Sequence, residues 1–126
     1  MPKITKRKRL IAECDKLWSL LIRTRDKHKC RVCGSPGGHP HHIMGRRYLG
    51  LRHEQKNGIT LCRDCHRDKA HGDPDNFRET VRILIGEDNF EQLSAIAHGG
   101  KVAVDLGDIK DKLKLILGKI SEVNVT

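Results

Sequence analysis

The chain of 126 residues has room for one domain with a modest core and is too short for two domains of ordinary size. One Trp, one Tyr and two Phe leave little aromatic surface to bury, so we expect aliphatic residues and a bound metal to stabilise the core. The sequence has no apolar run of about 20 residues and its basic start lacks the apolar segment of a signal peptide, so we expect no membrane span and a cytoplasmic location.

The formal net charge of +9 is concentrated in the first part of the chain. Residues 1–31 carry a net charge of +8, residues 32–73 carry +3 and residues 74–126 carry −2. This distribution favours binding to nucleic acid, although basic character also suits anionic membrane surfaces or simple solubility. The candidate residues for contacts to the DNA backbone in this part are Lys6, Arg7, Lys8 and Arg9.

The apolar pattern predicts one domain in three parts. Residues 1–27 form a basic leader, over residues 3–9, and then an amphipathic helix. The apolar face of that helix contains Leu10, Cys14, Leu17, Trp18, Leu21 and Ile22. We expect Cys14 to be a small buried hydrophobe on this face. Residues 28–72 are rich in Cys, His, Gly and Arg and contain one short strand signal, over residues 58–61.

Residues 73–126 are predicted to be helical. Asp73 and Pro74 suit the cap and first position of a helix that ends at Gly86. A second helix, over residues 89–97, is expected to bury Phe90, Leu93 and Ile96 before a Gly-Gly break. The last amphipathic helix has its apolar face at Ile109, Leu113, Ile116, Leu117 and Ile120. Helices around a short strand segment give an α+β fold.

Two Cys-x-x-Cys pairs, Cys30 with Cys33 and Cys62 with Cys65, are separated by 28 residues. Paired thiols in a reducing compartment predict one tetrahedral Zn²⁺ site with four thiolate ligands. A closed site of this kind stabilises the fold and takes no part in chemistry. Two alternatives remain open: two redox-active pairs, for which no βαβ pattern is present, and a mixed site that uses His66.

Three further elements lie between and beside the cysteine pairs: His41-His42-Ile43, then Asn57-Gly58-Ile59-Thr60-Leu61-Cys62, then Cys65-His66. In this order and spacing they resemble the motif of HNH nucleases with embedded zinc knuckles, over about residues 30–71. The resemblance implies a ββα-metal core within the α+β fold. It also implies a metal-dependent endonuclease that hydrolyses DNA phosphodiester bonds.

The resemblance implies a role for each motif residue. In the family pattern the first residue of the pair binds the catalytic metal and the second is the general base, so His41 would be a ligand and His42 would accept the proton. Alternation along a strand agrees, because neighbouring side chains point to opposite faces. Asn57 would orient the loop that carries the base, or would only form an Asn-Gly turn. His66 would be the second metal ligand.

His71 is a weaker candidate for a third ligand, because it follows His66 by five residues and α-helical ligand pairs are usually four apart. The expected catalytic ion is Mg²⁺ or Mn²⁺. Ni²⁺ or Zn²⁺ is left open, because His rather than Asp at position 41 makes the site less anionic. Arg46 and Arg47, beside the presumed base, are candidate DNA phosphate ligands. The remaining histidines match no motif and are expected to be exposed: His28, His39, His53 and His98.

The chain also resembles phage recombination nucleases of the NinG (Rap) type. The resemblance is based on Leu17-Trp18-Ser19 and Ile22-Arg23-x-Arg25-Asp26, then Gly86-Glu87-Asp88, Leu93 and a closing helix rich in Lys and Leu. It implies cleavage of branched DNA, such as Holliday junctions, during DNA recombination by a phage-encoded protein in a bacterial host. The stretch HHIMGRR, residues 41–47, departs from those relatives, so their substrate preference does not transfer directly.

Two other functions stay open on the sequence. A non-catalytic zinc module that binds DNA needs only the four cysteines and the basic leader, but it leaves the His-His and Asn motifs without a purpose. An HNH nuclease that acts on RNA would have the same site. The oligomeric state is also open, and symmetric cutting of two strands would require two active sites, as in a dimer.

Overall fold

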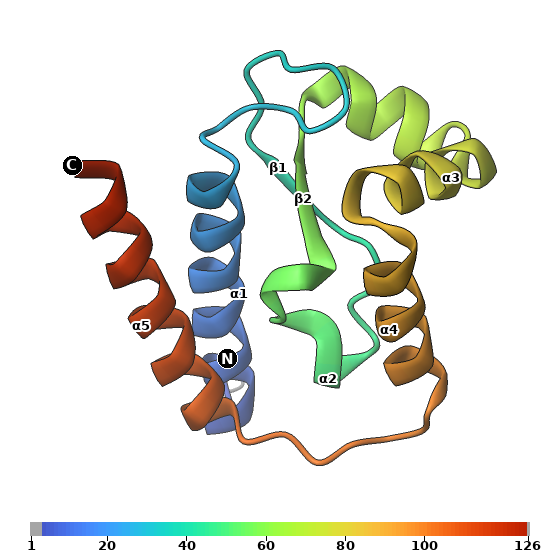
Figure 1. Cartoon of the computed structure of the whole chain (residues 1–126). Helices are drawn as coiled ribbons and strands as arrows, with labels where there is room; N and C mark the ends of the chain where they lie inside the picture. The colour runs from blue at the N-terminus through green and yellow to red at the C-terminus, as the bar shows by residue number, and fades with distance from the viewer. Residues whose placement is uncertain (1–3, 126) are drawn as a thin grey trace.

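The computed structural model describes the backbone of residues 4–125 and the side chains of residues 4–120 (Figure 1). Residues 1–3 and 126 lie outside the described residues, and with them Lys3 of the predicted leader. The elements in chain order are α1 (Lys6–Arg25), β1 (His39–His42), α2 (Leu49–Arg52), η1 (Gln55–Asn57), β2 (Gly58–Leu61), η2 (Cys65–His71), α3 (Pro74–Ile85), α4 (Glu87–His98) and α5 (Leu106–Val125).

A two-stranded antiparallel hairpin lies at the centre of the fold. β1 pairs with β2 so that His41 is opposite Ile59 and His42 is opposite Gly58. The strand signal over residues 58–61 is confirmed, and η2 follows β2 after a short connection. The predicted α+β fold with a ββα core is therefore confirmed, with helices before and after it (Figure 1).

β2 is buried along its whole length because it packs on both faces. Ile59 and Leu61 belong to a core cluster with Phe77 of α3. On the other face, the Thr60 hydroxyl donates to the Ile22 carbonyl of α1 (3.3 Å), and a Cβ at Gly58 would collide with the Trp18 ring. Antiparallel partners share a face, so this alternation directs His41 towards η2 and α3 and directs His42 towards α1.

α1 is longer than the sequence predicted. The helix begins at Lys6, with the Thr5 hydroxyl accepting a hydrogen bond from the Lys8 amide (3.2 Å). The prediction of a leader before the helix is therefore wrong for residues 6–9, which form its first turn because Thr5 provides the cap. α5 lies beside α1 (Figure 1), and most of the predicted apolar face packs against it. Cys14 is fully buried on this face, as expected.

The carboxylate of Asp26 joins the end of α1 to β2. It accepts hydrogen bonds from the Thr60 amide (2.9 Å) and from Arg25, and its side chain is only 3% exposed. Burial by itself would raise the pKa of Asp26, but the hydrogen bonds and charge of Arg25 outweigh it and lower that pKa below its usual value. Asp26 thus fixes α1 against the hairpin.

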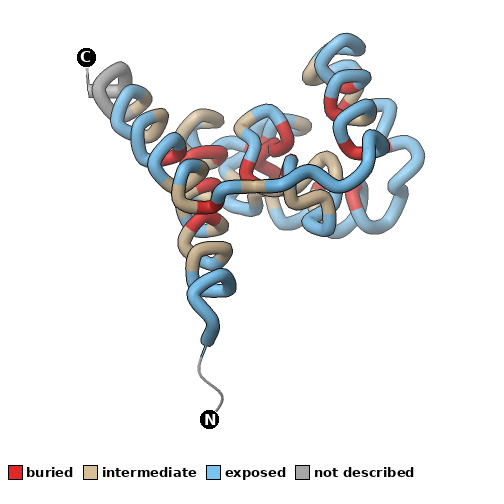
Figure 2. Tube along the Cα trace, turned by 90° about the horizontal axis from the view of Figure 1, so that it is seen from below, coloured by how far each residue is buried: buried red, intermediate tan, exposed pale blue. Residues whose placement is uncertain are grey.

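The C-terminal helices form as predicted, with one correction in α4. α3 begins at Pro74 and ends before Gly86, which has a φ of 90°. α4 runs over Glu87–His98 and buries Phe90, Leu93 and Ala97, whereas Ile96 is 48% exposed. The prediction that Ile96 is buried is wrong, because the face of α4 that meets the core passes through Ala97. A mostly exposed segment over residues 99–105 then connects α4 to α5 (Figure 2). Within the described residues, no helix combines the length and the apolar character that crossing a membrane requires.

Candidate functional site

The four paired cysteines come together in one group. Their sulfur atoms all lie within 4.8 Å of one another, and the Sγ atoms of Cys33 and Cys62 are 3.6 Å apart. Four thiolates at about 2.3 Å around a tetrahedral Zn²⁺ would have sulfur atoms about 3.8 Å apart. The group therefore fits one Zn²⁺ ion and does not resemble two separate redox pairs. His66 belongs to a different cluster, which argues against the mixed Cys/His alternative.

The loops around this group favour thiolate ligands. Gly34 directly follows the first pair with a φ of 79°, a conformation that suits glycine, and its amide donates to the Cys30 carbonyl (2.9 Å). Hydrogen bonds from Ser35 lower the pKa of Cys33 to about 6. Burial and the neighbouring sulfurs raise the pKa of Cys65. A thiol with a raised pKa becomes a thiolate ligand when a cation is present to replace its proton.

A second cluster contains His41, His66 and His71, with one ring nitrogen from each lying within 4.8 Å of the others. The Nε2 atoms of His66 and His71 are 3.2 Å apart, close to the roughly 3.3 Å between nitrogen ligands of a tetrahedral Zn²⁺. Burial, and then the neighbouring histidines, lower the pKa of His41 to about 4, and burial also lowers the pKa of His66. Neutral imidazoles are the form that binds metal.

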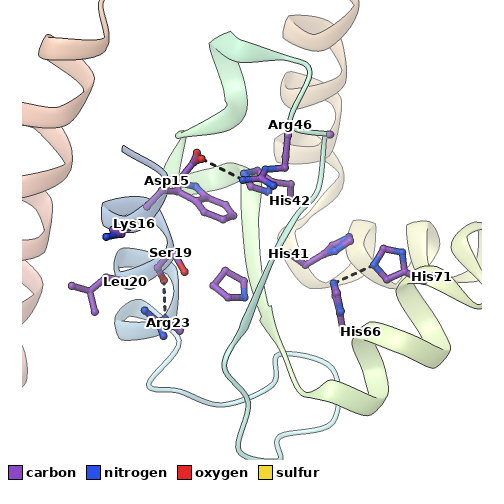
Figure 3. A pocket seen from close by; sticks show the side chains of 13 residues that line it. Asp15, Lys16, Ser19, Leu20, Arg23, His41, His42, Arg46, His66 and His71 are labelled. Carbon is purple, nitrogen blue, oxygen red and sulfur yellow. Dashed lines mark hydrogen bonds and ion pairs between the residues drawn. The ribbon is translucent and has the colours of Figure 1, made fainter. Parts of the chain in front are cut away.

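η2 explains how His71 reaches this cluster. The segment Cys65–His71 is a π-helix, in which hydrogen bonds join residues five positions apart. Residues at i and i+5 therefore lie one above the other, and His66 and His71 do so in Figure 3. The usual spacing of four residues between two ligands holds for an α-helix and does not apply to η2. Isolated π-helical turns occur often at functional sites, where they realign side chains.

His42 lies on the opposite face of β1 from His41 (Figure 3). Its Nε2–H donates to the Arg52 carbonyl (2.9 Å), because a carbonyl can only accept. The ring also stacks on Trp18, with centroids 3.9 Å apart and planes 10° apart. Burial lowers the pKa of His42. At neutral pH the ring is then neutral, with its free electron pair on Nδ1.

Asn57 holds the loop between β1 and α2. Its amide group donates to the carbonyls of Met44 and Leu51 (both 3.0 Å), and its Oδ1 accepts from the Met44 amide (2.7 Å). The side chain is fully buried. Asn57 ends the short helix η1, and Gly58 has an extended backbone, so this dipeptide is not a hairpin turn.

A cleft of about 890 Å³ connects the two faces of β1 and opens between α1 and η2 (Figure 3). His41, His42, His66 and His71 line it together with basic, polar and apolar side chains. The contributions from α1 and the loop after β1 are Asp15, Lys16, Trp18, Ser19, Leu20, Arg23, Gly45 and Arg46. The cleft combines imidazoles, a candidate base and three basic side chains, a set suited to a phosphodiester.

The two arginines predicted to bind phosphate are placed differently. Arg46 lines the cleft and its side chain is 62% exposed. Arg47 lies over the ring of Tyr48, 4.7 Å from its centroid, and lines neighbouring hollows of the surface instead. The basic residues Lys6, Arg7, Lys8 and Arg9 are all exposed on the first turn of α1.

Three residues near His42 have contacts that the sequence did not predict. His53 was expected to be exposed, but it is 5% exposed and its Nε2 donates to Asp15 (2.7 Å), so that prediction is wrong. Asp15 and Arg52 form a doubly hydrogen-bonded ion pair (2.7 and 2.9 Å). No motif marks these residues, because Asp15 and Arg52 are 37 positions apart and meet only through packing. His28, His39 and His98 are exposed, as predicted.

Comparison with known proteins gives one match. The family described as HNH endonuclease matches residues 30–72, which span the four cysteines, both strands and η2. No curated protein and no solved structure matches the chain. The match covers both clusters of candidate metal ligands and leaves α1 and the C-terminal helices outside it.

Proposed function

We propose that this protein, whose residues 30–72 match the family described as HNH endonuclease, hydrolyses phosphodiester bonds of DNA with the help of a divalent metal ion. The observation that carries the proposal is the joint placement of the three-histidine cluster and His42 in one cleft with basic walls. A bound metal ion supplies charge neutralisation at the phosphate and at the leaving oxygen. The four cysteines would hold a separate structural Zn²⁺.

His41, His66 and His71 are the residues that would hold the catalytic ion. Among the described residues, this cluster contains no carboxylate. Imidazole ligands suit Zn²⁺, Ni²⁺ and other transition metals, whereas Mg²⁺ prefers oxygen ligands. Of the two ions expected from the sequence, Mn²⁺ therefore suits this site better than Mg²⁺, and Ni²⁺ or Zn²⁺ would also fit.

His42 is proposed as the general base. Donation from Nε2 to the Arg52 carbonyl leaves Nδ1 as the atom that accepts a proton from the attacking water. The lowered pKa keeps this ring neutral at the pH of a cytoplasm. Asn57 is proposed to act by orientation, because its three hydrogen bonds fix the loop that begins directly after His42.

The walls of the cleft provide the charge that attracts DNA. Arg46 lies on one side, and Lys16 and Arg23 of α1 lie on the other (Figure 3). Lys6 to Arg9 extend this basic surface along the first turn of the same helix. We therefore propose that the DNA backbone follows α1 from the cleft towards its N-terminus, with Arg46 nearest to the scissile phosphate. Arg47 is the weaker candidate, because Tyr48 holds it.

Branched DNA is the proposed preferred substrate. This part of the proposal is based on the resemblance to phage recombination nucleases and on a basic surface that extends beyond the cleft. The surface offers charges and few groups suited to particular bases, so it would recognise the shape of the DNA.

Cleavage assays test the proposal. The purified protein, loaded with one equivalent of Zn²⁺, is incubated with a four-way junction, linear duplex of equal length and RNA, each with Mg²⁺, Mn²⁺, Ni²⁺ or no added ion. We expect metal-dependent cleavage of DNA, faster with Mn²⁺ or Ni²⁺ than with Mg²⁺, and tighter binding of the junction. DNA binding without cleavage under every condition would favour the non-catalytic zinc module, and cleavage confined to RNA would reassign the substrate.

A further inference from the structure

The carboxylate of Asp15 in α1 accepts hydrogen bonds from three side chains of the segment between β1 and β2. The Oδ1 atom of Asp15 accepts from Arg52 Nε (2.9 Å) and His53 Nε2 (2.7 Å). Its Oδ2 atom accepts from Arg52 Nη2 (2.7 Å) and Arg46 Nη2 (3.3 Å). Asp15 lies before residues 30–72 and thus outside the matched HNH segment. The loop is therefore attached to a helix that the family motif does not contain.

Arg52 connects Asp15 to the proposed base, His42. Arg52 supplies the carbonyl that accepts the Nε2–H of His42 (2.9 Å). Asp15 holds the side chain of Arg52 and the ring of the next residue, His53. These contacts fix the backbone at Arg52 and His53. The Arg52 carbonyl is therefore held where it accepts the Nε2–H of His42, and this hydrogen bond selects the tautomer of His42. A carbonyl that shifted away would leave both ring nitrogens of His42 free to carry the proton.

Trp18 fixes the ring of His42 from a second direction. The two rings are stacked at 3.9 Å, and the indole N–H donates to the Glu54 carbonyl (2.9 Å), two residues after Arg52. Trp18 is 3% exposed, and a Cβ at Gly58 would not fit against it. The indole is therefore held by its surroundings and limits rotation of the imidazole.

We infer that Asp15 and Trp18 are positioning residues of the nuclease site, which hold His42 in one tautomer and one orientation. The inference rests on the proposed function, in which His42 is the base. It makes α1 a part of the active site and gives a role to Trp18 within the Leu17-Trp18-Ser19 segment.

The placement of Asp15 argues against a purely structural role. α1 is already joined to α5 by an apolar interface and by the Glu13–Lys110 ion pair (2.7 Å), and to β2 by Asp26. Asp15 instead lines the cleft, where a negative charge opposes the binding of DNA. The hydrogen bonds that Asp15 accepts from Arg46, Arg52 and His53 explain why a carboxylate lies in the cleft. Burial would raise the pKa of Asp15, but the hydrogen bonds from Arg52 and His53 lower it, so it stays charged.

The test compares Asp15→Asn and Trp18→Phe with Glu13→Gln. Glu13→Gln is the matched control. It removes an ion pair of the same helix, with Lys110 of α5, that has no contact with the residues around His42. Trp18→Phe keeps an aromatic ring and loses the hydrogen bond to Glu54. Zinc content and thermal unfolding establish that each variant is folded. Each is then assayed for kcat, KM and DNA affinity, and the tautomer of His42 is observed by ¹⁵N NMR of histidine-labelled protein, assigned with His42→Gln.

We expect Asp15→Asn to lower kcat at least about tenfold, since small displacements of a reacting group have effects of this size or larger. KM should change less than about twofold, and DNA should bind equally or more tightly, because a negative charge has left the cleft. The His42 spectrum should change from the Nε2–H form to a mixture of tautomers. Trp18→Phe should have an intermediate effect, and Glu13→Gln should leave kcat and the spectrum unchanged.

An unchanged kcat in both variants would overturn the inference, and so would a lower kcat with an unchanged His42 spectrum. The NMR measurement needs no cleavage. If the wild-type protein cleaved no nucleic acid, the proposed function would fail by itself, while the spectrum would still show whether α1 positions His42.

Discussion

The Nε2 atoms of His66 and His71 lie 3.2 Å apart, although five residues separate them in the chain. The π-helical turn of η2 produces this approach, and both rings lie edge-on to His41, with centroids 5.6 and 6.1 Å from its own. We therefore expect His66→Ala and His71→Ala each to weaken divalent metal binding at least about tenfold, a usual cost of disturbing a metal site.

Calorimetric titration of Mn²⁺ or Ni²⁺ into protein that already contains its structural Zn²⁺ measures this effect. His39→Ala is the matched control, since His39 is exposed and stacks on His66 at 5.5 Å but lies outside the cluster. Unchanged affinity in His71→Ala alone would remove His71 from the ligand set, and unchanged affinity in both variants would refute the site.

His42→Ala should retain zinc, fold and DNA affinity and lose at least about a hundredfold in cleavage rate, the usual range for a general base. The reason is that the other histidines of β1, His39 and His41, lie on the opposite face of the strand and cannot replace the ring of His42. Single-turnover cleavage of a labelled oligonucleotide gives the rate, with the exposed His98→Ala as the control. A rate within about threefold of wild type would assign the base elsewhere.

Cys62→Ser should lose the bound zinc and most cooperative unfolding, because a structural metal site contributes its binding free energy directly to folding. Cys14→Ser is the control: it changes a buried cysteine outside the zinc group and should keep one Zn²⁺ per chain. Mass spectrometry measures the zinc content of each variant, and thermal unfolding measures how cooperatively it unfolds. A well-folded, zinc-free Cys62→Ser protein would contradict the four-cysteine site.

Asp26→Asn should lower the free energy of unfolding by roughly 2 kcal/mol at neutral pH, the scale of hydrogen bonds to a charged group. The pKa of Asp26 is lowered in the folded state, so the unfolded chain binds its proton more readily. Its contribution to stability is complete above the unfolded pKa of about 3.9 and is lost as the pH falls through the folded pKa.

Urea unfolding of wild type and Asp26→Asn from neutral to strongly acidic pH tests this prediction, and the two should converge at the acidic end. Glu79→Gln is the control, because its surface ion pair with Arg82 should contribute less than about 1 kcal/mol. A constant difference between the two proteins across the whole range would show that the charge of Asp26 is not responsible.

Replacing Lys6, Arg7, Lys8 and Arg9 by Gln should weaken DNA binding and reduce its salt dependence. The slope of log K against log salt should fall by about 0.9 for each phosphate that the protein no longer neutralises. Substitution is preferable to deletion, since these residues form the first turn of α1. Affinity measured from about 50 to about 200 mM salt, where such binding depends steeply on salt, gives the slope.

The control for this experiment replaces Lys112, Lys114 and Lys119, exposed lysines of α5 that do not line the cleft. An equal change of slope in both sets would mean that the DNA does not follow α1. The cleavage rate at saturating protein should be the same in all three proteins, because the substituted residues are outside the cleft.

The local sequence predicted the features that depend only on residues close together in the chain. The spacing of the cysteines predicted the four-sulfur group, the apolar pattern predicted β2 and most helices, and alternation predicted that His41 and His42 face opposite ways. The regular spacing of side chains along a strand or helix, and the short loops between paired cysteines, determine these features. A few neighbouring residues are enough to specify each of them.

Tertiary structure alone decided which groups surround the proposed base, His42. Asp15 meets Arg52 and His53 across 37 and 38 positions, and Trp18 meets Glu54 across 36. Such contacts depend on how α1 packs on the hairpin, and no local pattern encodes that packing. His53 is buried for the same reason, although a lone histidine in a polar segment is expected to be exposed. The π-helical turn that brings His71 to His66 also lies beyond α-helical periodicity, because it changes which residues share a face.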